Sequence, residues 1–360
     1  MLAPATAALS RLGQSLWLDN ITRDLLDHGT LQHYIDTMSV TGLTSNPTIF
    51  DKAIASSTAY DAEIRDRHSA GESDETLFFH LAIADLRRAA DLFATVYAAR
   101  CGVDGFVSLE VSPQLAHDTD ATIAQAKSLH ASAARANLYM KIPGTAEGIP
   151  AIAECIFAGV PVNVTLLFSV SQYRAAADAW LNGLERRVSA GLAPDTASVA
   201  SLFVSRWDVA VADRTSAPLR NTLGIAIAGQ VYRAYRETLE SDRFQRLQNF
   251  GARAQRLLFA STGTKDPAAS DTLYVGALAA PNTINTLPEG TLQAFAAHGY
   301  TPATMRHAAG EADAMVARHV AAGIDIDALG AQLQEEGARS FVASWQSLLA
   351  AIARKRQQAA

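Results

Sequence analysis

The chain has 360 residues, of which 49% are hydrophobic and 18% are charged, enough apolar material for the large buried core of a soluble globular protein. Its net charge of −6 and the lack of a basic stripe argue against binding to nucleic acid, which needs clustered positive charge. The chain contains no uninterrupted run of about 18 apolar residues, so no membrane span is expected.

Cysteine and histidine usage gives no sign of a disulfide framework or a metal site. Cys101 and Cys155 are the only cysteines, and they lack the spacing of a zinc site. The nine histidines form no HxH or HExxH arrangement, so metal ligation is not expected. Residues Met1–Gly13 hold one arginine and no long apolar core, a poor match to a signal peptide, and these features together favour a reducing cytoplasm.

Short apolar runs alternate along the chain with longer segments of helical periodicity. This alternation is typical of βα units that build a parallel sheet, and eight strands close a barrel. No linker rich in proline, glycine or serine divides the chain. The sequence therefore predicts an α/β fold, a (β/α)8 TIM barrel with additional helices, forming a single domain over residues 1–360. The predicted strands are Ser15–Asp19, Gly42–Asn46, Phe106–Val111, Asn137–Ile142, Val160–Phe168, Val199–Val204, Arg256–Ser261 and Thr283–Leu287.

Between the strands lie segments with the lengths of crossover helices. Asp74–Arg100 carries an apolar stripe along one face, and Ser171–Ala190 is a second such segment. The charged segment Phe50–Ser73 is predicted to be loop or short helix. After the eighth strand, a helical extension over about 302–360 holds two further helical patterns, and Asp327 is predicted to cap the last one.

Polar residues recur at the carboxyl ends of the predicted strands. Parallel strands that are buried on both faces should be nearly all apolar, so these residues need an explanation. Residues two apart in a strand point to the same face, and in a closed barrel such side chains converge at the mouth, where active sites of this fold lie. The residues are Asp19, Thr44, Asn46, Ser108, Glu110, Lys141, Asn163, Thr165, Ser201 and Ser261.

Lys141 stands out because it lies near the end of the apolar run Asn137–Ile142, in a chain with only five lysines. Burial lowers the pKa of an ammonium group, by ~3–5 units when complete, and so produces a neutral amine that can attack a carbonyl. A buried ion pair is the main structural alternative. The sequence favours Lys141 as a nucleophile.

The other polar residues each have a structural interpretation as well. Asp19 could cap the helix that follows it, and Asn46-Pro47 is a turn signal. Glu110 could be the partner in a salt bridge. Thr165 and Ser201 could be core hydroxyls with satisfied hydrogen bonds, the more common fate of single serines and threonines.

The end of the seventh strand has the parts of a phosphate site. Phe259–Lys265 offers hydroxyls, loop amides beside a glycine, and a cation, at a place where barrels often bind phosphate. Arg206 follows the sixth strand, and a planar guanidinium suits bidentate contact with phosphate. Arg206 or Lys265 alone could be a solvated loop charge, but together with Ser261 they predict a phosphorylated ligand.

These residues occur in blocks that resemble the transaldolase family, whose members are class I Schiff-base enzymes of the pentose phosphate pathway. The resemblance runs from about Leu16 to Thr291. It rests on seven ordered blocks, namely Leu18-Asp19, Thr44-Ser45-Asn46-Pro47-Thr48, Leu109-Glu110-Val111, Tyr139-Met140-Lys141-Ile142-Pro143, Asn163-Val164-Thr165-Leu166-Leu167-Phe168, Ser201-Leu202-Phe203-Val204-Ser205-Arg206 and Ala260-Ser261.

The resemblance implies a role for each of these side chains. Lys141 would form the imine, Asp19 would move the proton of the sugar C4 hydroxyl, and Glu110 with Thr165 would hold a catalytic water. The implied substrate contacts are Asn46, Asn163, Ser201 and Phe203, and the implied phosphate contacts are Arg206 and Ser261.

The implied reaction transfers a dihydroxyacetone unit between sugar phosphates. Sedoheptulose 7-phosphate and glyceraldehyde 3-phosphate would give erythrose 4-phosphate and fructose 6-phosphate, with no cofactor. The expected partners are the sugar-phosphate substrates, and the sequence leaves open whether the chain acts alone or as a homodimer.

The chain departs from the family pattern in two places. Many members carry an arginine shortly after the strand-seven serine, where this chain has Thr262-Gly263-Thr264-Lys265, so Lys265 is expected to bind phosphate instead. Leu202 and Ser205 replace the proline and the glycine that are common in the sixth strand. The similar, shorter fructose-6-phosphate aldolases usually have glutamine in place of Glu110 and tyrosine in place of Phe203, and this chain has the transaldolase choice at both.

Three other functions stay open at the level of sequence. A simple aldolase would release free dihydroxyacetone instead of transferring it. A pyridoxal-phosphate enzyme also combines a lysine with a phosphate cup on a barrel. A non-catalytic sugar-phosphate sensor is disfavoured because Lys141, Asp19 and Glu110 are all retained.

Overall fold

A computed structural model describes residues 2–69, 71–300, 304–305 and 310–359, so part of the predicted extension, including Pro302, lies outside the described residues. Its eight strands form one sheet, and every paired neighbour is parallel. The order along the sheet is β2-β1-β8-β7-β6-β5-β4-β3. The strands are β1 (Ser15–Leu18), β2 (Val40–Leu43), β3 (Val107–Glu110), β4 (Leu138–Pro143), β5 (Val162–Leu167), β6 (Ser198–Phe203), β7 (Arg256–Ala260) and β8 (Thr283–Leu287).

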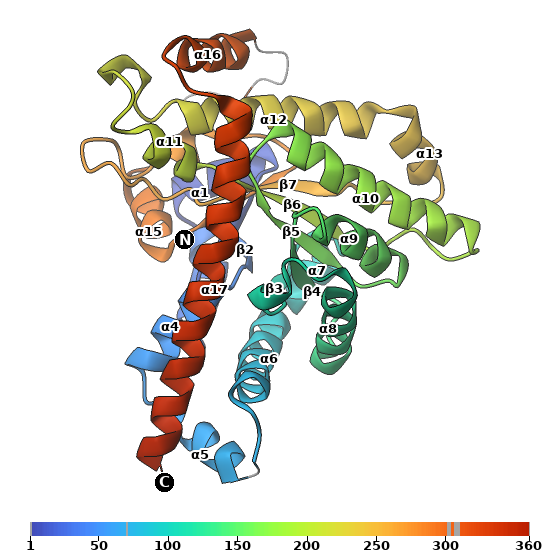
Figure 1. Cartoon of the computed structure of the whole chain (residues 1–360), viewed down its shortest axis with the longest axis vertical. Helices are drawn as coiled ribbons and strands as arrows, with labels where there is room; N and C mark the ends of the chain where they lie inside the picture. Colours follow the sequence, from blue (N-terminus) through green and yellow to red (C-terminus); the bar gives the residue numbers. More distant parts are fainter. Residues whose placement is uncertain (1, 70, 301–303, 306–309, 360) are drawn as a thin grey trace.

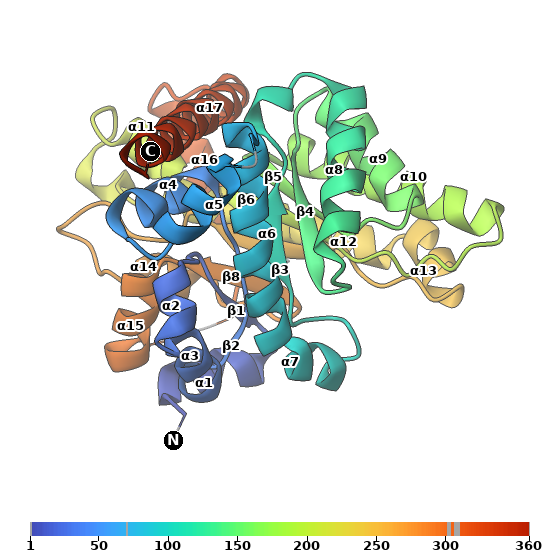
Figure 2. The same ribbon diagram turned by 90° about the horizontal axis from the view of Figure 1, so that it is seen from below.

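Helices surround the strands (Figures 1 and 2). None of the described helices is both long and apolar enough to cross a membrane. Two short 3₁₀ turns, η1 (Pro113–Leu115) and η2 (Ala217–Leu219), accompany the α-helices. The α-helices are α1 (Pro4–Leu12), α2 (Arg23–Asp27), α3 (Thr30–Met38), α4 (Pro47–Ser56), α5 (Asp61–Ser69), α6 (Asp74–Leu92), α7 (Ala94–Ala99), α8 (Thr119–Ala133), α9 (Gly148–Phe157), α10 (Val170–Ser189), α11 (Ser205–Val211), α12 (Leu223–Glu240), α13 (Asp242–Asn249), α14 (Leu273–Ala277), α15 (Glu289–His298), α16 (Gly310–Ala321) and α17 (Ile326–Ala359).

The two edge strands, β2 and β3, approach each other and nearly close the sheet into a barrel. The Leu43 amide donates to the Phe106 carbonyl at 3.0 Å, and the Gly105 amide donates to the Thr41 carbonyl at 3.0 Å. Gly42 permits this approach, because a Cβ there would lie 2.7 Å from the Phe106 oxygen. The predicted (β/α)8 barrel fold is confirmed.

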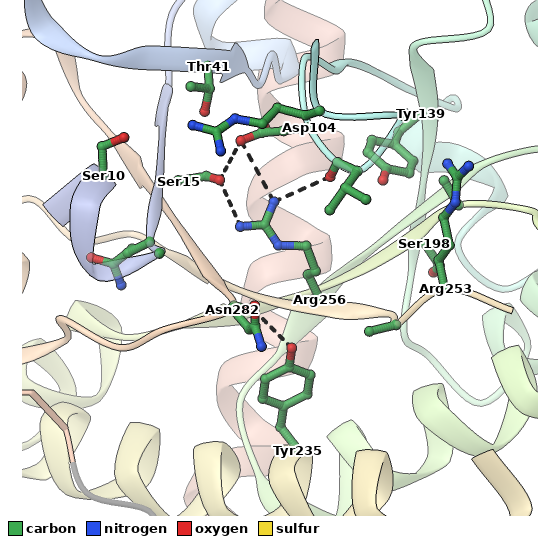
Figure 3. A pocket seen from close by; sticks show the side chains of 17 residues that line it. Ser10, Ser15, Thr41, Asp104, Tyr139, Ser198, Tyr235, Arg253, Arg256 and Asn282 are labelled. Carbon is green, nitrogen blue, oxygen red and sulfur yellow. Dashed lines mark hydrogen bonds and ion pairs between the residues drawn. The ribbon is translucent and has the colours of Figure 1, made fainter. Parts of the chain in front are cut away.

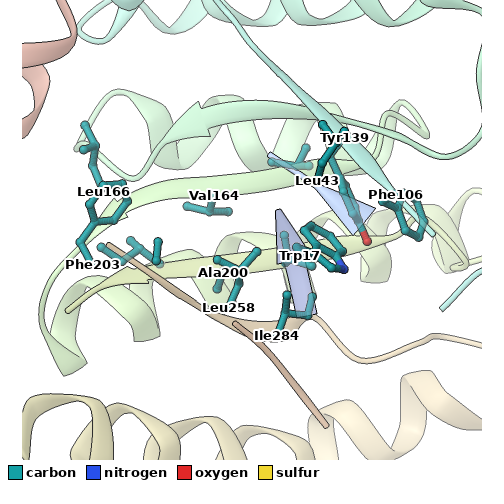
Figure 4. Packing of buried hydrophobic residues seen from close by; sticks show 14 of the residues in the cluster. Trp17, Leu43, Phe106, Tyr139, Val164, Leu166, Ala200, Phe203, Leu258 and Ile284 are labelled. Carbon is teal, nitrogen blue, oxygen red and sulfur yellow. The ribbon is translucent and has the colours of Figure 1, made fainter. Parts of the chain in front are cut away.

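The two-residue period of each strand sorts the interior side chains into levels. In β1, Ser15 lines a cavity at the amino ends of the strands, Trp17 is buried, and Asp19 lines a second cavity at the carboxyl ends. Trp17 packs in an apolar layer with Leu258 and Ile284 (Figure 4), which separates the two cavities. Polar groups therefore reach the interior at both ends of the barrel.

The eight predicted strands are all present, with ends that differ from the predicted ones by at most three residues. The predicted helix Asp74–Arg100 is divided into α6 and α7, which share Phe93 as a capping residue. The segment Phe50–Ser73, predicted as loop or short helix, holds α5 and the part of α4 from Phe50 onward. The prediction that Asp327 caps the last helix is wrong. The Asp325 carboxylate accepts from the Ala328 amide at 3.0 Å, so Asp325 is the cap, and Asp327 lies inside the first turn.

The last helix, α17, is a single rod that crosses the molecule from beside α16 to α5 (Figure 1). The Trp345 ring packs edge-on against Phe78 with centroids 5.0 Å apart, and the Ser344 hydroxyl bonds that of Thr48 at 2.7 Å. Nearer the C-terminus, Lys355 donates to the Ser57 carbonyl at 2.8 Å. These contacts fix α17 against α4 and α6.

Candidate active site

A cavity of about 320 Å³ opens at the carboxyl ends of the strands. Side chains from the strand ends line it, together with residues of α4 and α17. The structure brings ten of the eleven predicted site residues to its wall, namely Asp19, Asn46, Lys141, Asn163, Thr165, Ser201, Phe203, Arg206, Ser261 and Lys265. The eleventh, Glu110, is buried directly beside Lys141.

Lys141 lies inside β4, where every residue is buried, and its side chain is only 7% exposed. Its Nζ donates to the Ser45 carbonyl at 2.7 Å and lies 3.7 Å from Glu110 Oε2. In the sheet register Lys141 pairs with Glu110 on one side and Asn163 on the other. The amine is held at the cavity wall by a neutral acceptor and one carboxylate.

Asp19 directly follows β1, and its amide donates to the Leu287 carbonyl at 2.7 Å. The Thr44 hydroxyl donates to Asp19 Oδ1 at 2.8 Å and lies 2.9 Å from the Thr286 hydroxyl. Burial raises the pKa of the Asp19 carboxyl, against the lowering effects of Lys141 and the Thr44 hydrogen bond. The alternative that Asp19 caps the next helix is wrong, since Thr22 accepts from the Leu25 amide and caps α2.

Glu110 ends β3, and burial raises its pKa to about 7, against the lowering effect of the nearby Lys141 charge. Its Oε2 has no hydrogen-bond partner among the described residues, and neither has the buried Thr165 hydroxyl. Strand register places Thr165 beside Pro143, two residues beyond Lys141. Buried polar atoms are normally satisfied, so these two are available to a water or a substrate group.

A hydrogen-bonded row crosses the floor of the site. The Ser201 hydroxyl donates to Asn163 Oδ1 at 2.6 Å, and Asn163 Nδ2 donates to the Ser108 hydroxyl at 3.3 Å. All three side chains are buried. The row fixes the Asn163 amide next to Lys141 at the cavity wall.

Asn46 has both a structural and a site position. Its Oδ1 accepts from the Ile49 amide at 3.0 Å and caps α4, with Pro47 in the first turn. The dipeptide Asn46-Pro47, interpreted from the sequence as a turn signal, is the start of α4. The side chain also lines the cavity, and its Nδ2 group remains free to donate.

Arg206 and Ser261 lie together at one side of the cavity. The Arg206 guanidinium sits 5.3 Å from the centre of the Phe203 ring, and burial lowers its pKa. Ser261 has a left-handed backbone with φ of 54°, and its hydroxyl lies 2.9 Å from that of Ser205. Ser205, which replaces a common glycine, thus positions Ser261 without occupying the cavity wall.

Lys265 reaches the cavity from the loop after β7. A Cβ on Gly263 would lie 3.9 Å from its Nζ, so the side chain folds back over that glycine. Lys265 also borders a neighbouring cavity of about 350 Å³. The structure brings Lys265 to the wall that Arg206 and Ser261 also line.

Comparison with known proteins agrees with this geometry. A family model described as transaldolase/fructose-6-phosphate aldolase matches residues 16–352. The chain belongs to this family. It is 46% identical over 355 residues to a transaldolase of Mycolicibacterium smegmatis, covering 96% of each chain, and 45% identical over 356 residues to that of Mycobacterium tuberculosis strain H37Rv, covering 96% of this chain and 95% of the relative. A transaldolase of Acidothermus cellulolyticus is 45% identical over 361 residues, covering 98% of this chain and 97% of the relative.

Sequence reasoning missed what α17 contributes to this transaldolase-family site. Ser340 and Phe341 line the cavity, and Gln334 Nε2 donates to the carbonyls of Gly144 and Leu166 at 2.9 Å each. Leu166 sits at an irregularity in β5 with φ of 57°, which turns its carbonyl out of the sheet ladder. The helical pattern of α17 was visible in the sequence, but nothing local indicated which part of the barrel it would cover.

A further cation also escaped the sequence analysis. Lys52 lines the cavity from α4 and remains well exposed to solvent. It lies in the segment that sequence alone left as loop or short helix. Only its place on α4, which starts at the capping residue Asn46, brings it to the mouth of the barrel.

Proposed function

We propose that this chain is a transaldolase that transfers a dihydroxyacetone unit through a Schiff base on Lys141. Sedoheptulose 7-phosphate and glyceraldehyde 3-phosphate would give erythrose 4-phosphate and fructose 6-phosphate. The observation that carries the proposal is the setting of the Lys141 amine, which lies at the cavity wall 3.7 Å from Glu110 and shares that cavity with Asp19.

In the first half-reaction the Lys141 amine adds to the C2 carbonyl of the donor ketose, and loss of water gives an iminium. The Asp19 carboxylate takes the proton of the C4 hydroxyl while the C3–C4 bond breaks. The bonding electrons move to the iminium, which becomes an enamine. The aldose phosphate leaves, and three carbons remain bound to Lys141.

In the second half-reaction the enamine carbon attacks the aldehyde of the acceptor, and Asp19 returns its proton to the new hydroxyl. Water then adds to the iminium, and the ketose product and free Lys141 are released. We infer that Glu110 and Thr165 hold that water, because each has a buried oxygen with no partner among the described residues. A carboxyl with a pKa of about 7 can both give and take a proton near neutral pH.

The phosphate group would bind away from the reacting carbons. Arg206, Ser261 and Lys265 line one part of the cavity wall, and contacts there supply affinity that orients the sugar over Lys141. The amides of Asn46 and Asn163 and the Ser201 hydroxyl would contact the hydroxyls of the dihydroxyacetone portion.

The second candidate is a fructose-6-phosphate aldolase, which the family also contains. Glu110 and Phe203 argue against it, since the aldolases usually have glutamine and tyrosine there. The Phe203 ring packs against Phe168 with centroids 5.5 Å apart and offers no hydroxyl to the site.

One assay separates the two activities. Purified protein is mixed with fructose 6-phosphate, with and without erythrose 4-phosphate, and both sedoheptulose 7-phosphate and free dihydroxyacetone are measured. Transfer that needs the acceptor supports the proposal. Steady release of dihydroxyacetone without the acceptor would instead support the aldolase.

A further inference from the structure

A second cavity, of about 310 Å³, lies at the opposite end of the barrel from the active site (Figure 3). It is close in volume to the cavity beside Lys141. Strands contribute Ser15, Tyr139 and Arg256 to its wall, and loops contribute Arg100 and Arg253. The apolar layer around Trp17 separates it from the catalytic residues.

The buried Arg256 is fully engaged inside the protein. Its guanidinium donates to the Ser15 hydroxyl at 2.7 Å and the Thr283 carbonyl at 2.8 Å, and it lies 3.8 Å from Asp104. Asp104 also accepts from Ser15 and from the Trp17 indole. Asp104 is the one carboxylate that lines the cavity, and its charge is offset by Arg256.

Arg100 and Arg253 leave an excess of positive charge on this cavity. Neither side chain makes a hydrogen bond or an ion pair with the residues that the structure describes. Gly102 lets Arg253 fold over the cavity rim, because a Cβ there would lie 2.6 Å from its guanidinium nitrogen. Because the charges of Asp104 and Arg256 offset each other, the guanidinium groups of Arg100 and Arg253 remain to bind an anion.

Two buried polar groups at the cavity also lack partners. Gln14 is 1% exposed, and its Nε2 donates to the Leu278 carbonyl and the Thr283 hydroxyl while its Oε1 accepts nothing from the described residues. The Thr283 hydroxyl itself donates to Ala280, so the Gln14 amide orientation is fixed. Tyr139 is 2% exposed, and its hydroxyl makes no hydrogen bond with the described part of the chain.

We propose that this basal cavity is a second ligand site, which binds the phosphate monoester of a small polyol. Arg100 and Arg253 would hold the phosphate dianion. The Tyr139 hydroxyl would donate to a ligand oxygen, and Gln14 Oε1 would accept from a ligand hydroxyl. A cavity of about 310 Å³ suits a ligand of that size.

The test measures binding in a protein that lacks Arg206, one of the three proposed phosphate contacts of the active site. Glucitol 6-phosphate is the probe because it has no carbonyl and cannot form an imine. It is titrated by calorimetry into the Arg206→Ala variant, and then into the same variant carrying Arg253→Ala, Arg100→Ala or Tyr139→Phe. Arg174→Ala is the matched control, since Arg174 is an exposed arginine paired with Glu237.

The proposal predicts that Arg206→Ala still binds the probe and that Arg174→Ala changes nothing. Adding Arg253→Ala or Arg100→Ala should weaken binding roughly ten- to hundredfold, the usual effect of losing one charge-assisted contact. Tyr139→Phe should weaken it several-fold without lowering the thermal midpoint, and inorganic phosphate and glucitol should each bind less tightly. Loss of all binding in Arg206→Ala, or binding that the three basal variants leave unchanged, would overturn the proposal.

Discussion

At the scale of single residues, the proposed mechanism divides the chemistry between Asp19 and Lys141. Asp19 lies in the same cavity as Lys141 and is held by the Thr44 hydroxyl, so its carboxylate has a fixed direction. Burial raises the pKa of Asp19, which makes it a better proton acceptor than an exposed aspartate. Its proposed role is limited to the transfer of the proton of the C4 hydroxyl.

Asp19→Asn should therefore still form the imine but break the carbon–carbon bond slowly. The expected loss is ~10²–10⁴-fold, the usual contribution of a positioned acid or base. Rapid-quench measurement of imine formation and of aldose release separates the two steps. An unchanged rate of cleavage would limit Asp19 to a structural role.

Glu110 makes the stability of the folded protein depend on pH. Burial raises its pKa from 4.5 to about 7, so the folded protein holds this proton more tightly than the unfolded chain. The stability from this group is complete below about pH 4.5 and is lost as the pH rises through about 7. Wild-type protein should thus lose stability over this range.

Glu110→Gln cannot ionise, so it should lose less stability than the wild type between about pH 5 and pH 8. The expected difference is on the order of 1–3 kcal/mol in the free energy of unfolding, measured by urea titration at both pH values. Glu240→Gln removes an exposed carboxylate and should follow the wild type. If the free energy of unfolding falls equally with pH in Glu110→Gln and in the wild type, Glu110 is not held protonated in the folded protein.

Lys265 is proposed to bind phosphate in place of the arginine that many family members carry after the seventh strand, next to the second proposed contact, Arg206. If both bind phosphate, changing either to alanine should weaken apparent affinity for phosphorylated sugars roughly ten- to hundredfold. Non-phosphorylated sugars should be nearly unaffected, which separates this effect from a loss of folding. Equal effects on both kinds of sugar at Lys265 would place its side chain outside the phosphate site.

At the scale of elements, α17 ties the mouth of the barrel together. Gln334 bonds the Gly144 carbonyl, three residues after Lys141, and the Leu166 carbonyl, one residue after Thr165. Removing that amide leaves two carbonyls without their donor, which typically costs about 1–3 kcal/mol. The loss should reach catalysis because Gly144 directly follows β4, which carries Lys141, and Leu166 lies in β5, which carries Thr165.

Gln334→Ala should lower kcat several-fold while imine formation at Lys141 persists, and it should lower the thermal midpoint. Gln332→Ala is the matched control, because Gln332 lies on the exposed side of the same helix and, among the described residues, its side chain pairs with Glu336 alone. If both variants behave as wild type in steady-state kinetics, α17 covers the site without positioning it.

The strands were predictable because their signal is local. Each is a short apolar run bounded by polar residues, and its last polar side chain falls at the barrel mouth by the two-residue period. The division of Asp74–Arg100 at Phe93 was not predictable, since the apolar pattern continues across it. The position of α17 was also not predictable, because helical periodicity shows that one face of a helix is buried but does not show which element it packs against.

At the scale of the whole molecule, the barrel has polar side chains at both ends of its interior and an apolar layer between them. The proposed catalytic residues come from strands far apart in sequence, and only closure of the sheet brings Asp19 to the cavity that Lys141 lines. The motif resemblance predicted this set of residues in advance. The cavity around Arg253 at the amino ends had no motif, since its groups are scattered single residues.

The most direct test of the central claim is to trap the imine and locate it. Protein is incubated with fructose 6-phosphate, reduced with borohydride, digested, and analysed by peptide mass spectrometry. The account predicts one adduct, on Lys141, which is lost together with activity in Lys141→Arg, because a guanidinium stays protonated and cannot attack. An adduct on Lys52 or Lys265, or full turnover in Lys141→Arg, would contradict it.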